Sequence, residues 1–570
     1  MSSLKNFLLK IIKNPPENQK ELEKLKRKWL KKVIPNTEIL KFYQKLVKNK
    51  EILRNKNLET ILRKRKVRTL SGVAVIAIFT KPYPCPGHCL YCPTQKNSPK
   101  SYLKNEPAMM RAILCNYNPA LQIKTRLETL AALGHPTDKI ELIVMGGTFS
   151  ALPRLYQLEF IIQCFKTCNN PRLKNSKFQF LISKQISNSK FLNNVNNVIL
   201  SDAERMRGEA EGSHKLNFKT LKVEQKKNGN AKHRIIGLTL ETRPDYINEN
   251  EIKWMRILGA TRIELGVQSI YDDVLKFNTR GHLVGKTIYA TKFLKDAGFK
   301  INYHIMPNLP KSTPLRDLKM FYKLFHNQNF QPDMLKIYPC VLTKNAPKLA
   351  RLWKEKKYKP YSDRQLINLL IKIKQQIPKY CRIMRLGRDI PATSILVGSK
   401  ISNIREVVAQ KMKEKKLKCR CIRCREIKNQ ITNNNQQITI KRFDYWASDG
   451  KEIFLSYEDL KNDKLIAFLR LRIPSFYFSG TKHFLPKLQN AALIREIHTY
   501  GQMVEIGKKI NKAVQHFGFG KKLVAQAEKI AAKEFKIKKI AVISGVGVRN
   551  FWRKLGYKLQ NTYMTKQIIC

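Results

Sequence analysis

Apolar residues between positions 72 and 340 gather in six short runs, and stretches with helical spacing of apolar residues separate them. Such β-branched runs are typical of strands buried on both faces of a parallel sheet. Strands that alternate with helices form βα units, and six units are too few to close an eight-stranded barrel. The pattern predicts an α/β fold with a partial parallel βα barrel over residues 71–380. The six runs are VAVIAIF, IELIVMGG, IIGLTLET, TRIELGVQS, INYHIMP and MLKIYPCV.

The pattern changes over residues 441–570. YEDLKNDKLIAFLRLRIP predicts two antiparallel strands, AALIREIHTYG a central strand, and QHFGFGKKLVAQAEKIAAKEF a loop followed by an amphipathic helix. KKIAVISGVGVRNFWRKLGYKL then predicts a strand, a helix and a terminal strand. We expect a second domain of mixed α+β type, joined to the barrel by an Arg/Cys-rich linker at 381–440.

Residues 1–70 combine helical periodicity with dense basic residues, as in ELEKLKRKWLKKV and ILRKRKVRTL. A basic segment of this kind can lie along a phosphate backbone, and interleaved aromatic residues can stack on bases. The aromatic residues are Trp29, Phe42 and Tyr43. We predict an RNA-binding arm, and the alternative is a solvated helix face. The predicted contact residues are Arg63, Lys64, Arg65 and Lys66.

Composition supports a polyanionic partner. Lys plus Arg number 110 against 42 Asp plus Glu, which gives a formal net charge of +68. Nucleic acid is the first candidate partner, although a general lysine bias of the source proteome would also raise the charge. Two tight cysteine triplets among the 12 cysteines indicate metal ligation in a reducing compartment, so we expect a cytoplasmic protein. The sequence holds no run of 18 apolar residues and no signal peptide, so we expect no membrane association.

The first triplet lies in YPCPGHCLYCPT, directly after the first apolar run. Cys85, Cys89 and Cys92 have the spacing C-x3-C-x2-C, and the next cysteine is Cys115. Three thiolates can ligate three irons of a 4Fe-4S cluster and leave the fourth iron without a protein ligand. S-adenosylmethionine (SAM) binds to such an open iron in radical enzymes. A zinc knuckle is the alternative, but its spacing is usually C-x2-C or C-x4-C with a second pair.

Polar and glycine residues follow the later strands, at the edge where barrel active sites lie. Gly146 and Gly147 come after the second run, and glycines there let a backbone approach a ligand closely. Glu241, Gln268 and His304 end the next strands. With the cysteines, this pattern resembles the radical SAM superfamily. That resemblance implies that the two glycines contact the amino group of the methionine moiety, and we expect Glu241 and Gln268 to bind cofactor.

The second triplet is Cys419, Cys421 and Cys424 in KCRCIRCRE. Its spacing C-x-C-x2-C is too tight for core packing and indicates zinc or a second iron–sulfur cluster. We favour a structural Zn²⁺ with a further ligand from elsewhere. We expect the neighbouring arginines to place this cysteine segment on a surface that faces RNA, since the guanidinium group of arginine matches phosphate well. They are Arg405, Arg420, Arg423 and Arg425.

Gln515, Gly518 and Gly520 form Q-x-x-G-x-G between a predicted strand and a predicted helix. Backbone N–H groups and the positive end of the helix would face a pyrophosphate there. The order of elements and this loop resemble the N-acetyltransferase (GNAT) fold, which binds acetyl-CoA.

Both halves together resemble the catalytic subunit of the Elongator complex and its stand-alone archaeal and bacterial counterparts, over about residues 65–570. The motifs are MGGTFSALP, ETRPDY, ELGVQSIYDDVL, NTRGH, REIHTYG and VISGVGVRN. This resemblance implies an enzyme that adds a carboxymethyl-type group from acetyl-CoA to carbon 5 of the wobble uridine, with the anticodon stem-loop of tRNA as partner. It also allows a homodimer. A protein lysine acetyltransferase and a non-catalytic RNA-binding scaffold are the alternatives.

The chemistry explains why such a family would pair two cofactors. Carbon 5 of uridine is no nucleophile toward a thioester, and the acetyl methyl group is no electrophile. A 5′-deoxyadenosyl radical can take a hydrogen atom from the methyl group, and the resulting radical can add to the base. The uridine must then leave its stack and enter a cleft between the domains.

The resemblance also carries individual residues. Cys85, Cys89 and Cys92 would hold the 4Fe-4S cluster, and Lys139 would handle acetyl-CoA. Where the family usually has two tyrosines, this chain has Phe551 and Trp552, so we expect Trp552 to pack against the coenzyme. If a phenol is needed, Tyr500 or Tyr557 must supply it. The remaining predicted coenzyme contacts are Glu496, Ile497, His498, Thr499, Phe519, Gly520 and Lys521.

Overall fold

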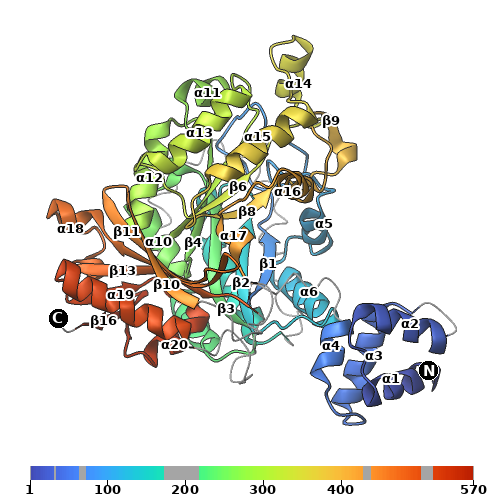
Figure 1. The fold of residues 1–570 in the computed structure, drawn as a ribbon. Helices are drawn as coiled ribbons and strands as arrows, with labels where there is room; N and C mark the ends of the chain where they lie inside the picture. The colour runs from blue at the N-terminus through green and yellow to red at the C-terminus, as the bar shows by residue number, and fades with distance from the viewer. Residues whose placement is uncertain are drawn as a thin grey trace.

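The computed structural model describes residues 2–30, 34–62, 72–171, 217–427, 438–501 and 518–568. These residues form a small helical module, a parallel sheet covered by helices, and a C-terminal mixed sheet (Figure 1). Within the described ranges, no helix is both long and apolar enough to cross a membrane.

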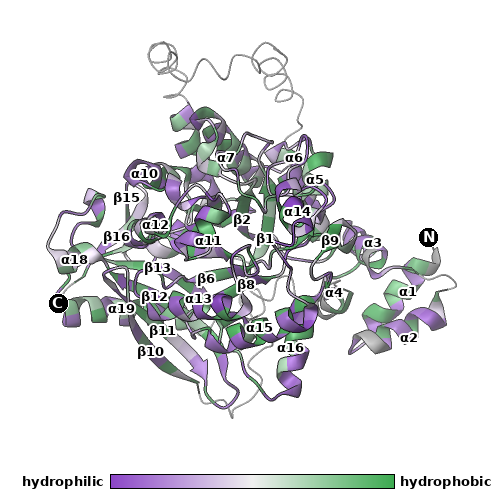
Figure 2. Ribbon diagram, turned by 90° about the horizontal axis from the view of Figure 1, so that it is seen from above, coloured by the Kyte–Doolittle hydropathy of each residue, from purple (hydrophilic) through white to green (hydrophobic). Residues whose placement is uncertain are grey.

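The N-terminal module is a compact group of helices and not an extended arm. Its helices pack around a core of their own and lie to one side of the main body (Figures 1 and 2). Gln44 Nε2 of the module donates to Ala131 O of the main body at 3.3 Å. The helices are α1 (Ser2–Lys13), α2 (Gln19–Trp29), α3 (Asn36–Lys48) and α4 (Lys56–Leu62).

Two of the three aromatic residues expected to stack on RNA are used inside this module. Tyr43 is fully buried and Phe42 packs against the core. Tyr43 shares a helix face with Ile39 and Leu40, which are buried too. Trp29 is 43% exposed, with the Lys10 ammonium 3.2 Å from its ring centroid. The predicted contact residues 63–66 lie outside the described residues.

A seven-stranded sheet of the order β1-β2-β3-β4-β5-β6-β8 forms the main body, and all neighbouring strands are parallel. All six predicted strands are present. The seventh, β8, begins two residues beyond the expected domain limit at 380, within the segment expected to be a linker. The strands are β1 (Ala74–Phe79), β2 (Lys139–Met145), β3 (Arg234–Thr242), β4 (Arg262–Gln268), β5 (Lys300–Ile305), β6 (Met334–Ile337) and β8 (Arg382–Leu386).

Helices between the strands cover the sheet, as βα units require. The hydrophobic colour in Figure 2 gathers on strands such as β1 and β2, whereas helices such as α7 alternate between the two colours. The core therefore lies between sheet and helices. The helices of this part are α5 (Pro107–Leu114), α6 (Pro119–Ala132), α7 (Arg154–Asn169), α10 (Glu249–Leu258), α11 (Asp272–Phe277), α12 (Val284–Asp296), α13 (Pro314–His326), α14 (Pro347–Lys354), α15 (Asp363–Gln376), α16 (Ile404–Glu414) and α17 (Ile422–Arg425), and residues 217–228 are helical as well. A two-stranded sheet adds β7 (Leu342–Thr343) and β9 (Ile395–Val397).

The C-terminal domain is a second seven-stranded sheet of the order β10-β11-β12-β13-β14-β16-β15. The predicted central strand β13 occupies the middle of this order, and it pairs in parallel only with β14. Helix α19 packs on the sheet through apolar residues of both. The elements are β10 (Ile438–Ala447), β11 (Gly450–Asp459), β12 (Lys464–Ile473), α18 (Ser475–Ser479), β13 (Ala491–Thr499), α19 (Phe519–Phe535), β14 (Lys539–Val542), α20 (Arg549–Arg553), β15 (Lys558–Gln560) and β16 (Tyr563–Gln567).

This domain packs against the N-terminal edge of the parallel sheet, where its strands begin. Arg495 on β13 pairs with Asp333 just before β6, and Arg382 at the start of β8 donates to Tyr500 Oη at 2.8 Å. The backbones also meet closely: a Cβ added to Gly545 would lie 1.9 Å from Ile236 O on β3. The C-terminal edge of the parallel sheet is left for the candidate site.

Candidate active site

The C-terminal ends of the parallel strands surround a cavity. Each strand contributes residues at or just beyond its end, as is typical of barrel enzymes. They include Cys85 and Cys92 after β1, Gly147 after β2, Glu241 on β3, Gln268 on β4, His304 on β5, Lys336 on β6 and Arg388 after β8. The fold therefore brings the first cysteine triplet together with three of the predicted cofactor residues.

The three cysteines lie on the loop after β1. Cys89 is buried, and Arg280 donates to its Sγ at 3.5 Å. A hydrogen bond from Cys92 and the positive charge of Arg280 lower the pKa of Cys89 to about 4. The Gly87 N–H points at Cys85 Sγ at 3.4 Å. The Arg280 guanidinium and the Gly87 backbone N–H both stabilise the thiolate form of cysteine, which is the form that ligates iron.

Hydrogen-bonding groups around the cysteines lack partners among the described residues. They are Arg243 Nη1, Arg280 Nε, Tyr91 Oη and Gln268 Oε1, all buried. Buried polar groups are normally paired, and those that are not mark a place for a ligand. Three thiol ligands beside arginines with unsatisfied N–H groups fit an anionic iron–sulfur centre with SAM beside it. The residues present therefore fit the cofactors that the sequence predicted.

The glycines after β2 have backbone conformations that other residues rarely adopt. Gly146 has φ +133° and Gly147 φ +96°, and a Cβ on Gly146 would lie 2.2 Å from Thr80 Oγ1. Gln268 also has positive φ, at 68°. Strained backbone of this kind gathers at ligand sites. The loop can therefore come close to a ligand in the cavity.

Hydrogen bonds and ion pairs within the protein hold the charged side chains of the cavity in place. Tyr102 Oη donates to Glu241 at 2.7 Å. Below it, His304 Nε2 lies 2.8 Å from Glu264, and Lys336 forms an ion pair with the same carboxylate. These two groups hold the pKa of Glu264 well below its usual range despite its burial, which acts in the opposite direction.

Sequence reasoning assigned no role to Arg280, Tyr102 and Lys336, and it placed Arg388 only within the arginine-rich region 382–425, which it expected to bind phosphates. Arg280 had a signal, since it lies in the NTRGH motif, but nothing in the spacing indicates that it meets Cys89, 191 positions away. Arg388 lies 5.6 Å from the Tyr102 ring and pairs with Glu106. Long-range contacts of this kind are set by the order of the strands.

Several predicted coenzyme residues meet in the C-terminal domain. A Cβ on Gly520 would lie 3.6 Å from Ile497 Cδ1 and 3.9 Å from Thr499 Oγ1, so the start of α19 lies against the end of β13. Gly518 caps α19 with φ 71°. The ring of Phe519 packs against that of Tyr457, with centroids 4.7 Å apart. Lys521 is exposed on the first turn, and Gln515 lies outside the described residues.

Other predicted coenzyme residues have different surroundings. The Glu496 carboxylate pairs with Arg470 at 2.9 Å and lies 3.8 Å from the Lys300 Nζ, so its side chain belongs to the domain interface. Trp552 is 2% exposed within the domain core, whereas Phe551 is 37% exposed. The His498 ring lies against the Tyr500 ring, tilted by 41°, with centroids 4.3 Å apart.

Lys139 lies at the end of its strand that is farther from the cavity. It begins β2, whereas Gly146 follows the end of that strand. Burial lowers the pKa of its ammonium group. It pairs in register with Arg234 on β3, near the loop of Gly545. Lys139 thus lies at the edge on which the C-terminal domain packs.

The second triplet also forms a group. The sulfur atoms of Cys419, Cys421 and Cys424 lie within 4.8 Å of one another at the start of α17. Lys374 Nζ lies 3.7 Å from Cys424 Sγ. Hydrogen bonds from Cys419 and Cys421 lower the pKa of Cys424, as a metal-binding thiolate needs. The donor set fits Zn²⁺ with one further ligand.

The arginines around this triplet differ from the expected RNA-facing surface. Arg425 is 2% exposed and forms ion pairs with Glu458 and Asp463 of the C-terminal domain. It therefore anchors the triplet to β11 and does not face RNA. Arg423 is half-buried, and Arg420 is exposed. A sequence cannot indicate which arginines have distant carboxylates as partners.

Residues 83–324 match the radical SAM superfamily, and residues 332–414 match a radical SAM C-terminal domain. A protein of Methanocaldococcus infernus, named tRNA uridine(34) acetyltransferase, is 43% identical over 546 residues, covering 94% of this chain and 91% of that protein. This chain belongs to the tRNA uridine(34) acetyltransferase family. Elongator complex protein 3 of Saccharomyces cerevisiae is 37% identical over 521 residues, covering 89% of this chain and 85% of that protein.

A solved structure supports the same assignment of the fold. Methanocaldococcus infernus Elp3, with an N-terminal deletion, superposes with a TM-score of 0.69 and 42% identity, covering 87% of this chain and 100% of that one. Members of the family thus share both halves of the present fold, the parallel half-barrel and the C-terminal mixed sheet. The predictions of family and fold class are confirmed.

Proposed function

We propose that this enzyme modifies carbon 5 of the wobble uridine of tRNA and joins to it the acetyl unit of acetyl-CoA through its methyl carbon. Membership of the tRNA uridine(34) acetyltransferase family supports this proposal. The observation that carries it is the cavity at the C-terminal edge, where the cysteine loop meets buried arginines that keep N–H groups without hydrogen-bond partners. The net charge of +68 agrees with an RNA substrate.

The cavity residues divide the work of this reaction. Cys85, Cys89 and Cys92 hold the 4Fe-4S cluster, and Arg280 stabilises the Cys89 thiolate. When bound, the cluster and SAM supply a carbon-centred radical that can remove a hydrogen atom from a methyl group. Glu241, held by Tyr102, accepts hydrogen bonds from the bound ligand.

The C-terminal domain binds acetyl-CoA between the end of β13 and the start of α19. Ile497, Thr499 and Gly520 meet there, and the N–H groups at the helix start favour the pyrophosphate. The exposed Phe551 is better placed than the buried Trp552 to meet the pantetheine. The second cysteine triplet holds a structural Zn²⁺, and no chemical step involves it.

Acetyl-CoA labelled with carbon-13 in the methyl group tests the proposal. The protein is reconstituted anaerobically with iron, sulfide and SAM and incubated with tRNA, and the nucleosides are analysed by mass spectrometry. We expect uridine to gain a carboxymethyl group that carries the label. Label on protein lysines, with unchanged nucleosides, would identify a lysine acetyltransferase and contradict the proposal.

A further inference from the structure

A second cavity lies between the barrel and the C-terminal domain, away from the residues proposed to react. One wall is the helix over residues 217–228, and the other is formed by α20 and the strands after it. Asn550 Nδ2 joins the two walls by donating to Gly229 O at 3.2 Å and to Asn230 Oδ1 at 2.7 Å. We call this space the Arg549 cavity.

Arg549 is the unusual residue of this cavity. Its side chain is 8% exposed, and its Nε has no hydrogen-bond partner. No described carboxylate lies within 4 Å of its guanidinium. Burial, and the charges of Arg256 and Arg553, lower its pKa to about 10. A buried cation without a counter-ion is costly, so the position favours an anion that binds from solution.

The rest of the lining supports an anion. Lys222, Lys226 and Arg553 line the cavity with Arg549, and none of the described lining residues is acidic. Arg549 and Arg553 are four residues apart and share one face of α20. Arginine forks with neighbouring lysines are the usual recognition set for phosphate.

Size and the apolar lining indicate more than an inorganic ion. The cavity has a volume of about 520 Å³, which lies in the range of small-molecule sites. Leu221, Ile257, Val546 and Leu559 supply an apolar wall beside the basic one. A nucleotide matches both walls, because its phosphate suits the basic wall and its flat base suits the apolar one.

The cavity is separate from the residues proposed to bind acetyl-CoA. Trp552, on another face of α20, packs against Tyr557 in the domain core with α19. None of the residues 496–499, 518–521, 551 and 552 lines the cavity, although Phe551 directly follows the lining residue Asn550. We propose that the Arg549 cavity binds the phosphate of a nucleotide, either free or within the bound RNA. This inference does not depend on the proposed reaction.

Calorimetric titrations of the full-length protein test the site, with ADP as one probe and an anticodon stem-loop RNA as the other. Each titration is run with and without saturating coenzyme A, so that ADP in the coenzyme site is recognised. The variants are Arg549→Met, Arg549→Lys, and Arg364→Met as the control. Arg364 is exposed on α15 and lines neither described cavity.

For a free nucleotide, we expect ADP affinity to persist with coenzyme A present and to fall at least tenfold in Arg549→Met. If the ligand is instead a phosphate of bound RNA, we expect no ADP binding in the presence of coenzyme A. The affinity of Arg549→Met for the stem-loop should then be at least fivefold lower than that of the parent, and its slope of log affinity against log salt should be smaller by about one. Arg549→Lys should retain part of either affinity, and Arg364→Met should match the parent. Unchanged affinity for both probes in Arg549→Met would overturn the proposal.

Thermal unfolding without ligand separates this role from a structural one. Because the unpaired buried charge is removed, Arg549→Met should melt at the same temperature as the parent or higher. Saturating probe should raise the melting temperature of the parent more than that of the variant. A variant that melts lower and keeps its affinity would show that Arg549 only supports the fold.

Discussion

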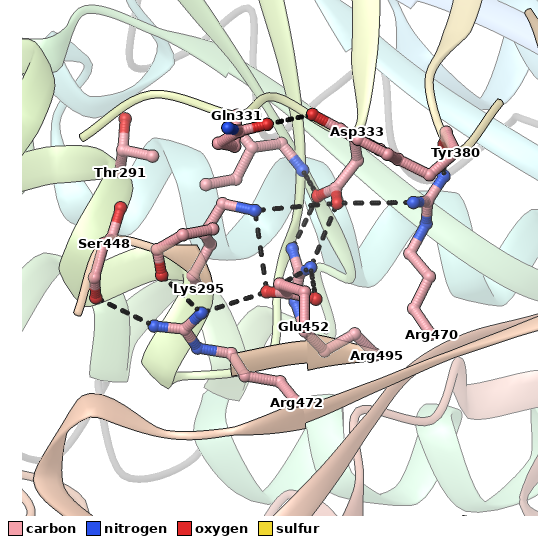
Figure 3. A network of polar contacts seen from close by, with 12 residues as sticks. Thr291, Lys295, Gln331, Asp333, Tyr380, Ser448, Glu452, Arg470, Arg472 and Arg495 are labelled. Carbon is pink, nitrogen blue, oxygen red and sulfur yellow. Dashed lines mark hydrogen bonds and ion pairs between the residues drawn. The ribbon is translucent and has the colours of Figure 1, made fainter. Parts of the chain in front are cut away.

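The two edges of the parallel sheet both hold buried charge, arranged in opposite ways. At the N-terminal edge, Lys295, Arg470, Arg472 and Arg495 each lie within 4 Å of a carboxylate. Figure 3 shows how the side chains of both domains point toward one another in this ionic network. The carboxylates facing these four cations are Asp296, Asp333, Glu452 and Glu496.

At the C-terminal edge, the partners of the buried arginines include a cysteine sulfur, and single N–H groups remain without partners. Arg280 contacts Cys89 and a backbone carbonyl, with no carboxylate within 4 Å among the described residues. Arg243 pairs with Asp245 but keeps an unpaired Nη1. Ion pairs across the interface at one edge fix the two domains to each other, whereas the arginines at the other edge face the cysteine loop, where an anionic cofactor can bind.

Removing a cluster ligand should have the largest effect. Cys89→Ser should lower the reductive cleavage of SAM more than a thousandfold, because the cluster loses one of its three protein ligands. Formation of 5′-deoxyadenosine measures it. Cys115→Ser is the control, since Cys115 is a buried cysteine of α5's C-cap outside the cavity. Activity of Cys89→Ser near that of the parent would refute the assignment of the C-terminal edge.

Breaking the ionic network should lower stability at the other edge. Asp333→Asn leaves Arg495, Arg470 and Lys295 with one carboxylate fewer, and loss of a buried partner costs about 3–5 kcal/mol. Chemical denaturation measures the free energy of unfolding. Glu355→Gln is the control, because its partners are exposed, and we expect no measurable change there. If the free energy of unfolding of Asp333→Asn changed as little as that of Glu355→Gln, the ionic network would not stabilise the interface between the two domains.

The C-terminal edge should also make stability sensitive to acid. Burial and the charge of Arg280 lower the pKa of His282 to about 4. Between pH 6.5 and 4 the unfolded chain binds a proton that the folded chain does not, so stability falls as the pH falls through this window. The contribution is about 3 kcal/mol.

The variant His282→Gln should lose that part of the pH dependence. Denaturation at several pH values measures it, with His326→Gln as the control, because His326 is exposed on α13. Parallel pH profiles for His282→Gln and the parent would contradict the prediction.

The sequence was informative where one local pattern carried the signal. Six strands and the first cysteine loop followed from apolar runs and spacing. β8 was missed because two of the five residues in RIMRL are arginines, so the segment does not resemble a buried strand. Tyr43 was assigned to RNA stacking because charge surrounds it in sequence, although its helix face is apolar.

The contacts that define the site could not be predicted in the same way. Arg425 meets Glu458 through a pairing of two domains, and Arg280 meets Cys89 through the order of the strands. In both cases the residue type was visible, but its partner depends on tertiary structure. Buried networks therefore had no signal in a single sequence.

Lys139 gives the smallest expected effect and the sharpest test of the comparison between the edges. It begins β2, and the six other residues of that strand, roughly 20 Å, separate it from the glycines at the cavity. Lys139→Met therefore cannot touch the SAM site, and cleavage of SAM without tRNA should stay within about twofold of the parent. We propose that Lys139 donates a charged hydrogen bond to the thioester, as the family resemblance implies. Loss of that bond, about 1.5 kcal/mol, should lower the yield of modified uridine about tenfold.

Both quantities come from the same anaerobic reaction, as 5′-deoxyadenosine and as modified nucleoside. Lys124→Met on α6 is the control, since it removes the same charge from the same part of the chain, and both yields should match the parent. If Lys139→Met lowered SAM cleavage as much as nucleoside formation, the two edges would not act separately. Lys139 would then belong to the cavity site, and the division of work between the two edges would be wrong.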